Sequence, residues 1–161
     1  MDERTLHSRL KELHESSFVW AMRCAAHDQS LAEDVLQTVY LKILEGKAVF
    51  EGRSTFKTWL FSVIRFTALD SFRANQIRLL RMKEYEDEVA EDHSPISGEG
   101  ADLRKKLAAL PLRQQQVLEL RFFHAMTLKE IAQVLEISIG SVRQHYDRGK
   151  KKMRILLIDK S

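Results

Sequence analysis

The chain has 161 residues, 44% of them hydrophobic, and 26 Lys or Arg against 23 Asp or Glu give it a formal net charge of +3. This composition suits one domain or two small ones that each bury a core. Cys24 is the single cysteine, which excludes an internal disulfide and a multi-cysteine zinc site, so we expect neither a metal nor a cofactor. The N-terminus lacks the apolar run of a signal peptide and no stretch could span a bilayer, so we expect a cytoplasmic protein without membrane insertion.

The charges are strongly segregated along the chain. Residues 53–83 hold seven Lys or Arg against one acid, residues 84–102 hold eight acids and no Lys or Arg, and residues 143–154 hold six basic residues against one acid. Two basic blocks with an acidic connector between them favour two surfaces that meet a polyanion.

Apolar residues recur at helical spacing almost throughout, and no stretch alternates at period two, so an all-α protein is predicted. The first clear helix spans 31–45, with a capping box of Ser30 and Glu33 at its start and Gly46 at its end. Its expected buried side comprises Val35, Leu36, Val39, Ile43 and Leu44. Its expected outward side comprises Glu33, Asp34, Gln37, Thr38 and Lys42.

A second, longer helix follows the loop "FEGRST". Its predicted inner stripe comprises Phe56, Trp59, Leu60, Val63, Ile64, Thr67, Ala68 and Phe72. Its other face carries Lys57, Arg65 and Arg73. Trp59 lies on the inner stripe, which favours core packing over a role as a stacking platform for a base.

The acidic stretch 83–102 contains Pro95 and two glycines and lacks an apolar stripe, so it is predicted to be a flexible linker between helical domains over 1–82 and 103–161. In the second domain Pro111 suits the first turn of a helix that runs to about Phe123. Thr127 and Glu130 form another capping box, which opens a short helix that ends near Leu135. Ser138 can cap the last helix.

The stretch from Thr127 to Met153 has the pattern of a helix-turn-helix. The residues spaced to pack two helices across the turn are Ile131, Ala132, Leu135, Ile137, Val142 and Tyr146. The residues that point away from this core are Ser141, Arg143, Gln144, His145, Arg148 and Lys151. Arg and Gln can pair with base edges in the major groove while Lys neutralises phosphates, so DNA binding is favoured over a solvated basic surface.

Three segments resemble a known family. The segments "LAEDVLQTVYLKIL", "FEGRSTFKTWLFSVIRFTALDSFR" and "LAALPLRQQQVLELRFFHAMTLKEIAQVLEISIGSVRQHYDRGKKKMR" are similar to regions 2 and 4 of bacterial sigma-70 family factors. The short linker without an intervening domain resembles the extracytoplasmic-function (ECF) group. The resemblance covers roughly residues 8–156. It implies an initiation factor that is not an enzyme and has no catalytic residues. Such a factor binds core RNA polymerase and recognises the −10 and −35 elements of promoter DNA.

The resemblance also implies roles for particular residues. The residues matching the polymerase-binding position, which contacts the clamp helices of the largest subunit, are Glu33, Asp34, Gln37 and Thr38. The residues matching the −10 and melting element are Arg53, Ser54, Thr55, Arg65, Phe66 and Arg73. The outward residues of the last helix match the −35 reader. Further implied partners are the second-largest polymerase subunit and an anti-sigma factor, which the group often has.

Two positions depart from the family pattern. Phe66 in "VIRFTALD" replaces an Asn that is common in the family, so a ring that can stack or pack stands where an amide could bond a base. Thr38 follows Gln37 where the family usually has an acid. Two other classes remain open, a helix-turn-helix regulator and a sigma-like decoy that does not support initiation, and reconstituted transcription distinguishes them.

Overall fold

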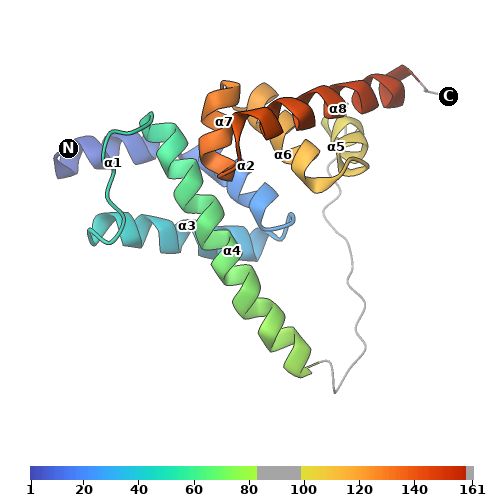
Figure 1. The fold of residues 1–161 in the computed structure, drawn as a ribbon. Helices are drawn as coiled ribbons and strands as arrows, with labels where there is room; N and C mark the ends of the chain where they lie inside the picture. The colour runs from blue at the N-terminus through green and yellow to red at the C-terminus, as the bar shows by residue number, and fades with distance from the viewer. Residues whose placement is uncertain (83–98, 159–161) are drawn as a thin grey trace. The chain divides into compact units, whose positions relative to one another are not determined.

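The computed structural model describes residues 1–82 and 99–158, which form eight α-helices and no strand (Figure 1). The predicted all-α class is therefore confirmed. The chain divides into two compact units, one containing helices α1–α4 and one containing α5, α6 and α8. Most of the predicted acidic linker, residues 83–98, lies outside the described residues.

The N-terminal unit consists of α1 (Glu3–Glu12), α2 (His14–Cys24), α3 (Gln29–Leu44) and α4 (Phe56–Met82). Helices α2, α3 and α4 pack against one another, and α1 packs against α2.

Trp20 of α2 lies at the centre of this packing. Its indole Nε1 donates to the backbone carbonyl of Phe61 on α4 over 3.1 Å, and the two rings are stacked with centroids 5.8 Å apart. Both side chains are completely buried. Replacing such a large core side chain by Ala typically costs about 3–5 kcal/mol, so this pair holds α2 and α4 together.

The start of α3 differs from the prediction. The helix begins at Gln29, and its N-cap is Asp28, whose carboxylate accepts from the Leu31 amide over 3.1 Å. The predicted capping box of Ser30 and Glu33 is therefore wrong, because both residues already lie inside the helix. The end agrees with the prediction, since Gly46 has a φ of +77° just beyond the helix, in the left-handed region that glycine adopts without steric cost.

The buried stripes of α3 and α4 follow the predicted period over most of their length. Val35, Leu36, Val39 and Ile43 are buried on α3, and Phe56, Leu60, Ile64, Thr67 and Ala68 are buried on α4. Two predicted core positions are wrong, since Leu44 is 45% exposed and Phe72 is also exposed. Trp59 is half-buried, and its ring packs against those of Phe50 and Phe56 at centroid distances of 5.5 and 5.4 Å.

The other helices are α5 (Glu99–Ala108), α6 (Leu112–Phe122), α7 (Leu128–Leu135) and α8 (Ile139–Ile158). Helix α5 begins at Glu99 instead of near Leu103. Helices α5, α6 and α8 pack against one another around Leu107, Leu110 and Leu118. The turn before α6 is fixed by Gln115, whose side-chain amide donates to the Leu110 carbonyl over 2.7 Å.

The helix-turn-helix segment has the predicted caps. The Thr127 hydroxyl accepts from the Glu130 amide over 3.1 Å, and the Glu130 carboxylate accepts from the Thr127 amide over 2.8 Å, so the capping box is confirmed. Glu136 has a φ of +55° and ends α7, and the Ser138 hydroxyl accepts from the Ser141 amide over 3.1 Å. Of the predicted core residues, Ile131, Leu135 and Val142 are buried and Ala132, Ile137 and Tyr146 are half-buried.

Candidate nucleic-acid and protein interfaces

Helix α3 has a second face opposite its buried stripe. Glu33, Asp34, Gln37 and Thr38 are all exposed on it, as the sequence predicts. Glu33 accepts from the Gln29 side-chain amide over 3.2 Å. Lys42, also expected outside, is half-buried because its ammonium donates to the Thr67 hydroxyl of α4 over 3.2 Å.

The exposed face of α3 also carries leucines that sequence analysis did not assign to a site. Asp34, Gln37, Thr38 and Leu41 recur at the i, i+3, i+4, i+7 spacing of one helical face. Leu41 is 53% exposed, and Leu44 lies three residues further along the same face. Exposed leucines beside polar side chains at helical spacing are typical of a surface that receives another helix.

The loop before α4 is exposed and ends in a well-defined cap. Arg53 and Thr55 are exposed and Ser54 is half-buried. The Thr55 hydroxyl accepts from the Thr58 amide over 3.1 Å and also contacts the Thr58 hydroxyl at 2.9 Å, which fixes the point where the loop enters the helix. Arg53 lies 3.7 Å from the Glu51 carboxylate in a solvent-exposed pair, which leaves its guanidinium accessible.

Farther along α4, the predicted residues differ in their accessibility. Phe66 is 57% exposed, which excludes core packing and leaves its ring available for stacking. Arg73 is exposed and lies 4.0 Å from Asp70. Arg65 is half-buried, and its Nε is buried without a hydrogen-bond partner.

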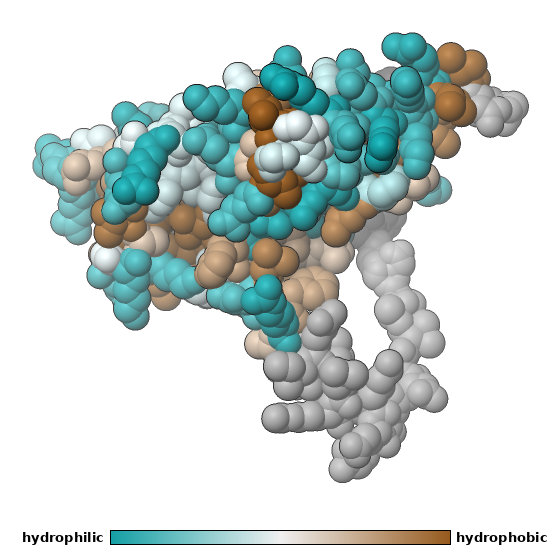
Figure 2. Space-filling view, viewed as in Figure 1, coloured by the Kyte–Doolittle hydropathy of each residue, from teal (hydrophilic) through white to brown (hydrophobic). Residues whose placement is uncertain are grey.

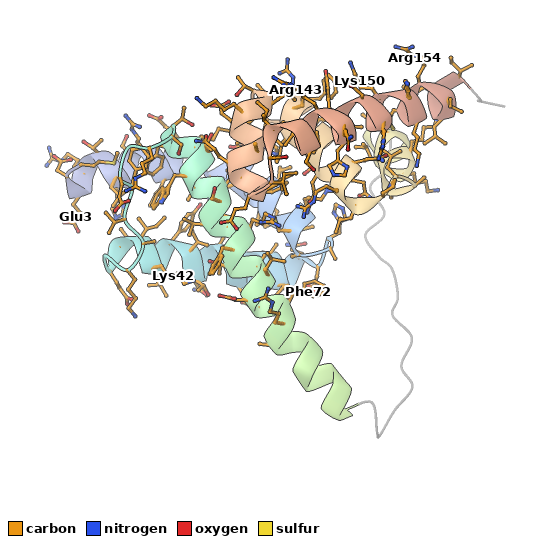
Figure 3. The ribbon with its side chains drawn as sticks, viewed as in Figure 1. Glu3, Lys42, Phe72, Arg143, Lys150 and Arg154 are labelled. Atoms are coloured by element: carbon orange, nitrogen blue, oxygen red, sulfur yellow. The ribbon has the colours of Figure 1, made fainter. Side chains whose placement is uncertain are left out.

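The outer face of α8 is strongly basic. Arg143, Gln144, Arg148 and Lys151 are exposed, and Ser141 is half-buried. The labelled side chains of Arg143, Lys150 and Arg154 are spaced along α8 (Figure 3), and those of Lys150 and Arg154 also border an apolar groove shared with α5 and α6. Cations therefore follow this helix over nearly its whole length, beyond the residues that the helix-turn-helix pattern selects.

His145, like Ser141, is less exposed than the other predicted residues of α8. It is half-buried, and its Nδ1 is buried without a hydrogen-bond partner. Burial lowers the pKa of His145, and the positive charges of Arg113 on α6 and Arg148 on α8 lower it further. The ring is therefore less accessible to a base edge than the sequence pattern indicates.

An apolar groove in the C-terminal unit was missed by sequence analysis. It has a volume of about 410 Å³ and is lined by Leu107 of α5, Phe122 of α6 and Met153 of α8, among others. Exposed apolar residues continue along the end of α8, where Figure 2 shows a brown surface beside the teal of the charged residues. The signal in the sequence is the run Ile155–Ile158, which follows the basic tail without an alternating polar residue.

In the described part of the chain, no group of three or more His, Cys, Asp or Glu is placed to hold a metal ion. None of the helices over residues 1–82 and 99–158 combines the length and apolar character that a membrane crossing requires.

Comparison with known proteins agrees with the two-unit arrangement. Residues 14–77 match the family model of Sigma-70 region 2, and residues 101–153 match that of Sigma-70, region 4. The chain is 34% identical over 137 residues to the ECF RNA polymerase sigma factor SigX of Bacillus subtilis, with 79% of this chain and 71% of that protein covered. It is 29% identical to the RNA polymerase sigma factor SigV of the same organism, with 89% and 86% covered.

Solved structures agree on the fold. The sigma factor RpoE of Bartonella quintana, solved in complex with the anti-sigma factor NepR, has a TM-score of 0.77 at 20% identity, with 98% of this chain and 99% of that chain covered. CnrH, solved in complex with the cytosolic domain of CnrY, has a TM-score of 0.66 at 21% identity, with 99% and 92% covered. With SigX matched over most of both chains and both sigma-70 regions present in order, the chain belongs to the ECF group of RNA polymerase sigma factors.

Proposed function

We propose that this alternative sigma factor uses three separate surfaces in promoter-specific initiation: the exposed face of α3 for core polymerase, the loop before α4 with its neighbouring residues for the −10 region, and the outer face of α8 for the −35 element. The observation that carries the proposal is the exposed face of α3, where Asp34, Gln37 and Leu41 share one side of a capped helix. A regulator that acts by binding DNA alone would not require a protein-binding face of this kind on α3.

The face of α3 suits a protein partner better than DNA. Asp34 would repel phosphates, whereas an acid and a glutamine beside exposed Leu41 and Leu44 can bind a helix that presents basic and apolar side chains. The clamp helices of the largest polymerase subunit are the proposed partner. The apolar groove of the C-terminal unit offers a second protein contact, which we assign to the second-largest subunit.

The DNA surfaces have the chemistry that each step requires. Arg143 and Gln144 are exposed on α8 and can make paired hydrogen bonds to base edges, and Arg148 and Lys151 are exposed cations that can neutralise phosphates. In the −10 region, unstacking a base costs a few kcal/mol. Arg53 and Arg73 supply charge for the opened strand, and the exposed ring of Phe66 supplies a stacking surface.

Reconstituted transcription tests the proposal. Core polymerase and the purified chain are incubated with genomic fragments, and start sites are mapped by sequencing the transcripts. The expected result is a set of starts that share −35 and −10 elements. Binding of core without initiation would indicate a decoy, and binding of specific DNA without any affinity for core would indicate a regulator.

Paired variants separate the surfaces in the same assay. Leu41→Glu should weaken core binding and leave the affinity of the free chain for −35 DNA unchanged, because Leu41 lies on the α3 face. Arg143→Ala should do the reverse. If both variants lost only DNA binding, the assignment of α3 to core polymerase would be wrong.

An anti-sigma factor is the proposed regulator. The sigma factor RpoE, which shares the fold, was solved in complex with the anti-sigma factor NepR, which supports sequestration as the means of control. A protein of this kind should compete with core polymerase for the chain and inhibit initiation in the reconstituted assay. Titrating it against labelled chain and core would measure both effects, and inhibition without competition would argue against sequestration.

A further inference from the structure

Lys150 of α8 is a cation that the helix-turn-helix pattern does not select, and an aromatic ring holds it. Its ammonium lies 4.3 Å from the centroid of the Tyr146 ring, one turn earlier on the same helix. A cation within about 6 Å of the centre of a ring face is attracted to it. The ammonium of this exposed lysine is therefore restrained, whereas exposed lysines ordinarily move among many rotamers.

The Tyr146 ring is itself held by its neighbours. It is half-buried, and it packs against the hydrophobic cluster of the C-terminal unit, which comprises Leu107, Leu110 and Leu118. Phe122 of α6 lies beside it, with the two ring centroids 6.1 Å apart. Packing within the unit therefore fixes the ring, and the ring in turn restrains Lys150.

The ammonium of Lys150 keeps its donors for a ligand. Within residues 1–82 and 99–158, Lys150 forms no ion pair with a carboxylate. A ring face attracts the charge of a cation, and the three N–H groups of an ammonium can still donate to other acceptors. A restrained cation suits a phosphate oxygen, because less side-chain freedom is lost when the contact forms.

Helical spacing puts Lys150 on the side of α8 that carries Arg143. The two residues are seven positions apart, which corresponds to two turns and about 10 Å along the helix axis (Figure 3). In a recognition helix the N-terminal residues contact the base edges. With Arg143 at a base, Lys150 therefore lies beyond the base edges, where phosphates border the major groove.

We propose that Lys150 contacts a phosphate at the edge of the −35 element and that Tyr146 is its positioning residue. The ring raises the affinity by restraining the ammonium before DNA binds, and it makes no contact with DNA itself. The contact carries no sequence information, because it is made to the phosphate backbone. This inference rests on the proposed function, since it extends the −35 surface by one phosphate.

The test measures the affinity of the full chain for a labelled −35 duplex, taken from a promoter mapped in the transcription assay, and for a scrambled duplex. Lys150→Met keeps an apolar stem and removes the charge. It should weaken binding to both duplexes by the same factor and reduce the slope of log affinity against log salt by about 0.9, as expected for one lost phosphate contact on B-DNA.

Two variants of Tyr146 separate its ring from its bulk. Tyr146→Leu keeps an apolar side chain but removes the ring, so it should lower the affinity for both duplexes about two- to tenfold, the range for ordering one flexible side chain on binding. Tyr146→Phe keeps the ring and removes only the hydroxyl, so it should bind as wild type does. Urea denaturation of each variant checks that the chain remains folded.

A double-mutant cycle shows whether Tyr146 acts through Lys150. In the Lys150→Met background, Tyr146→Leu should cost no further affinity, because the ammonium that the ring restrains is gone. Lys152 supplies the control cycle, since it is an exposed cation two residues further on, and residues at this spacing do not share a helical face. The effects of Tyr146→Leu and Lys152→Met should therefore be additive.

Three results would overturn the inference. Equal losses from Tyr146→Leu in the wild-type and Lys150→Met backgrounds would show that the ring acts only through packing. An unchanged salt slope in Lys150→Met would exclude the phosphate contact. A loss of core binding with unchanged affinity for DNA would assign Lys150 to the protein partner of the apolar groove that it also borders.

Failure of the proposed function would look different. The wild-type chain would then bind the promoter duplex and the scrambled duplex equally. The cycle could still be measured on the scrambled duplex, because a phosphate contact does not depend on sequence.

Discussion

Gly149 on α8 lies so close to Leu118 on α6 that a Cβ atom at position 149 would come within 3.1 Å of Leu118 Cδ1. The same atom would lie 3.5 Å from Cβ of Gln114. Gly149 is buried, and it lies among the basic residues of α8, between Arg148 and Lys150. The close approach of α6 and α8 at this glycine therefore fixes the position of the basic face of α8 relative to α6.

Gly149→Val should lower the free energy of unfolding by about 1–3 kcal/mol, because the added side chain overpacks a filled contact with Leu118. Chemical denaturation of the full chain measures the change. Gly140→Ala is the control on the same helix, since a Cβ there meets only Ser138 Oγ at 3.9 Å. It should be neutral or gain up to about 1 kcal/mol from helix propensity. A neutral Gly149→Val would show that the two helices separate at little cost.

Arg143→Ala should cost about 1–3 kcal/mol of binding free energy and relax the preference at one −35 position, because Arg143 is exposed and can pair with a base edge. Lys151→Ala should weaken binding to all sequences and flatten the salt dependence. Competition assays with single-base variants of the −35 element, run at several salt concentrations, distinguish the two effects. Equal, sequence-independent losses would count against direct readout by Arg143.

Acidification should destabilise the protein through His145. Burial, together with Arg113 and Arg148, holds the folded-state pKa of this ring below its ordinary value of 6.5. As the pH falls through 6.5 the unfolded chain therefore takes up a proton first, which favours unfolding until the pH passes below the folded-state pKa. The free energy of unfolding should thus rise with pH between the folded-state pKa and about pH 6.5, and it should level off above that range.

The measurement compares wild type with His145→Gln in urea at pH 7.5, 6.5 and 5.5. The other histidines are common to both proteins, so the difference between their free energies of unfolding isolates position 145. Wild type should lose stability relative to the variant as the pH is lowered. The opposite trend would mean that the protonated ring gains a partner in the folded state.

Helical periodicity predicted most of the fold because the N-terminal unit is built from amphipathic helices. Val35 and Val39 are buried at the spacing that the sequence shows. The pattern failed at Leu44, the last residue of α3, and at Phe72, which lies within α4, because both side chains are exposed. The capping prediction failed because Asp28 and Ser30 are both suitable N-cap residues, and only the observed start at Gln29 selects Asp28.

The candidate sites were predictable where one helix supplies them and not where two elements meet. The exposed residues of α3 and α8 follow from the spacing within each helix. The half-burial of His145 depends on how closely α8 approaches α6, and so does the contact of the Tyr146 ring with Phe122. Neither contact leaves a signal in local sequence, because the partners are tens of residues apart.

Thr38 lies on the exposed face of α3, so a charge placed there would meet any protein that covers this face. Thr38→Glu should strengthen core binding by less than about 1 kcal/mol, since a single solvent-exposed ion pair is rarely worth more. Thr38→Ala should leave binding unchanged, because the hydroxyl supplies no charge. Asp34→Asn provides the reference for loss of one carboxylate from the same face. Titration of labelled chain with core polymerase measures all three, and reconstituted transcription shows whether the unmodified protein is already active. A tenfold gain for Thr38→Glu, together with an inactive wild type, would contradict this expectation and indicate a switch in which phosphorylation of Thr38 supplies the missing negative charge.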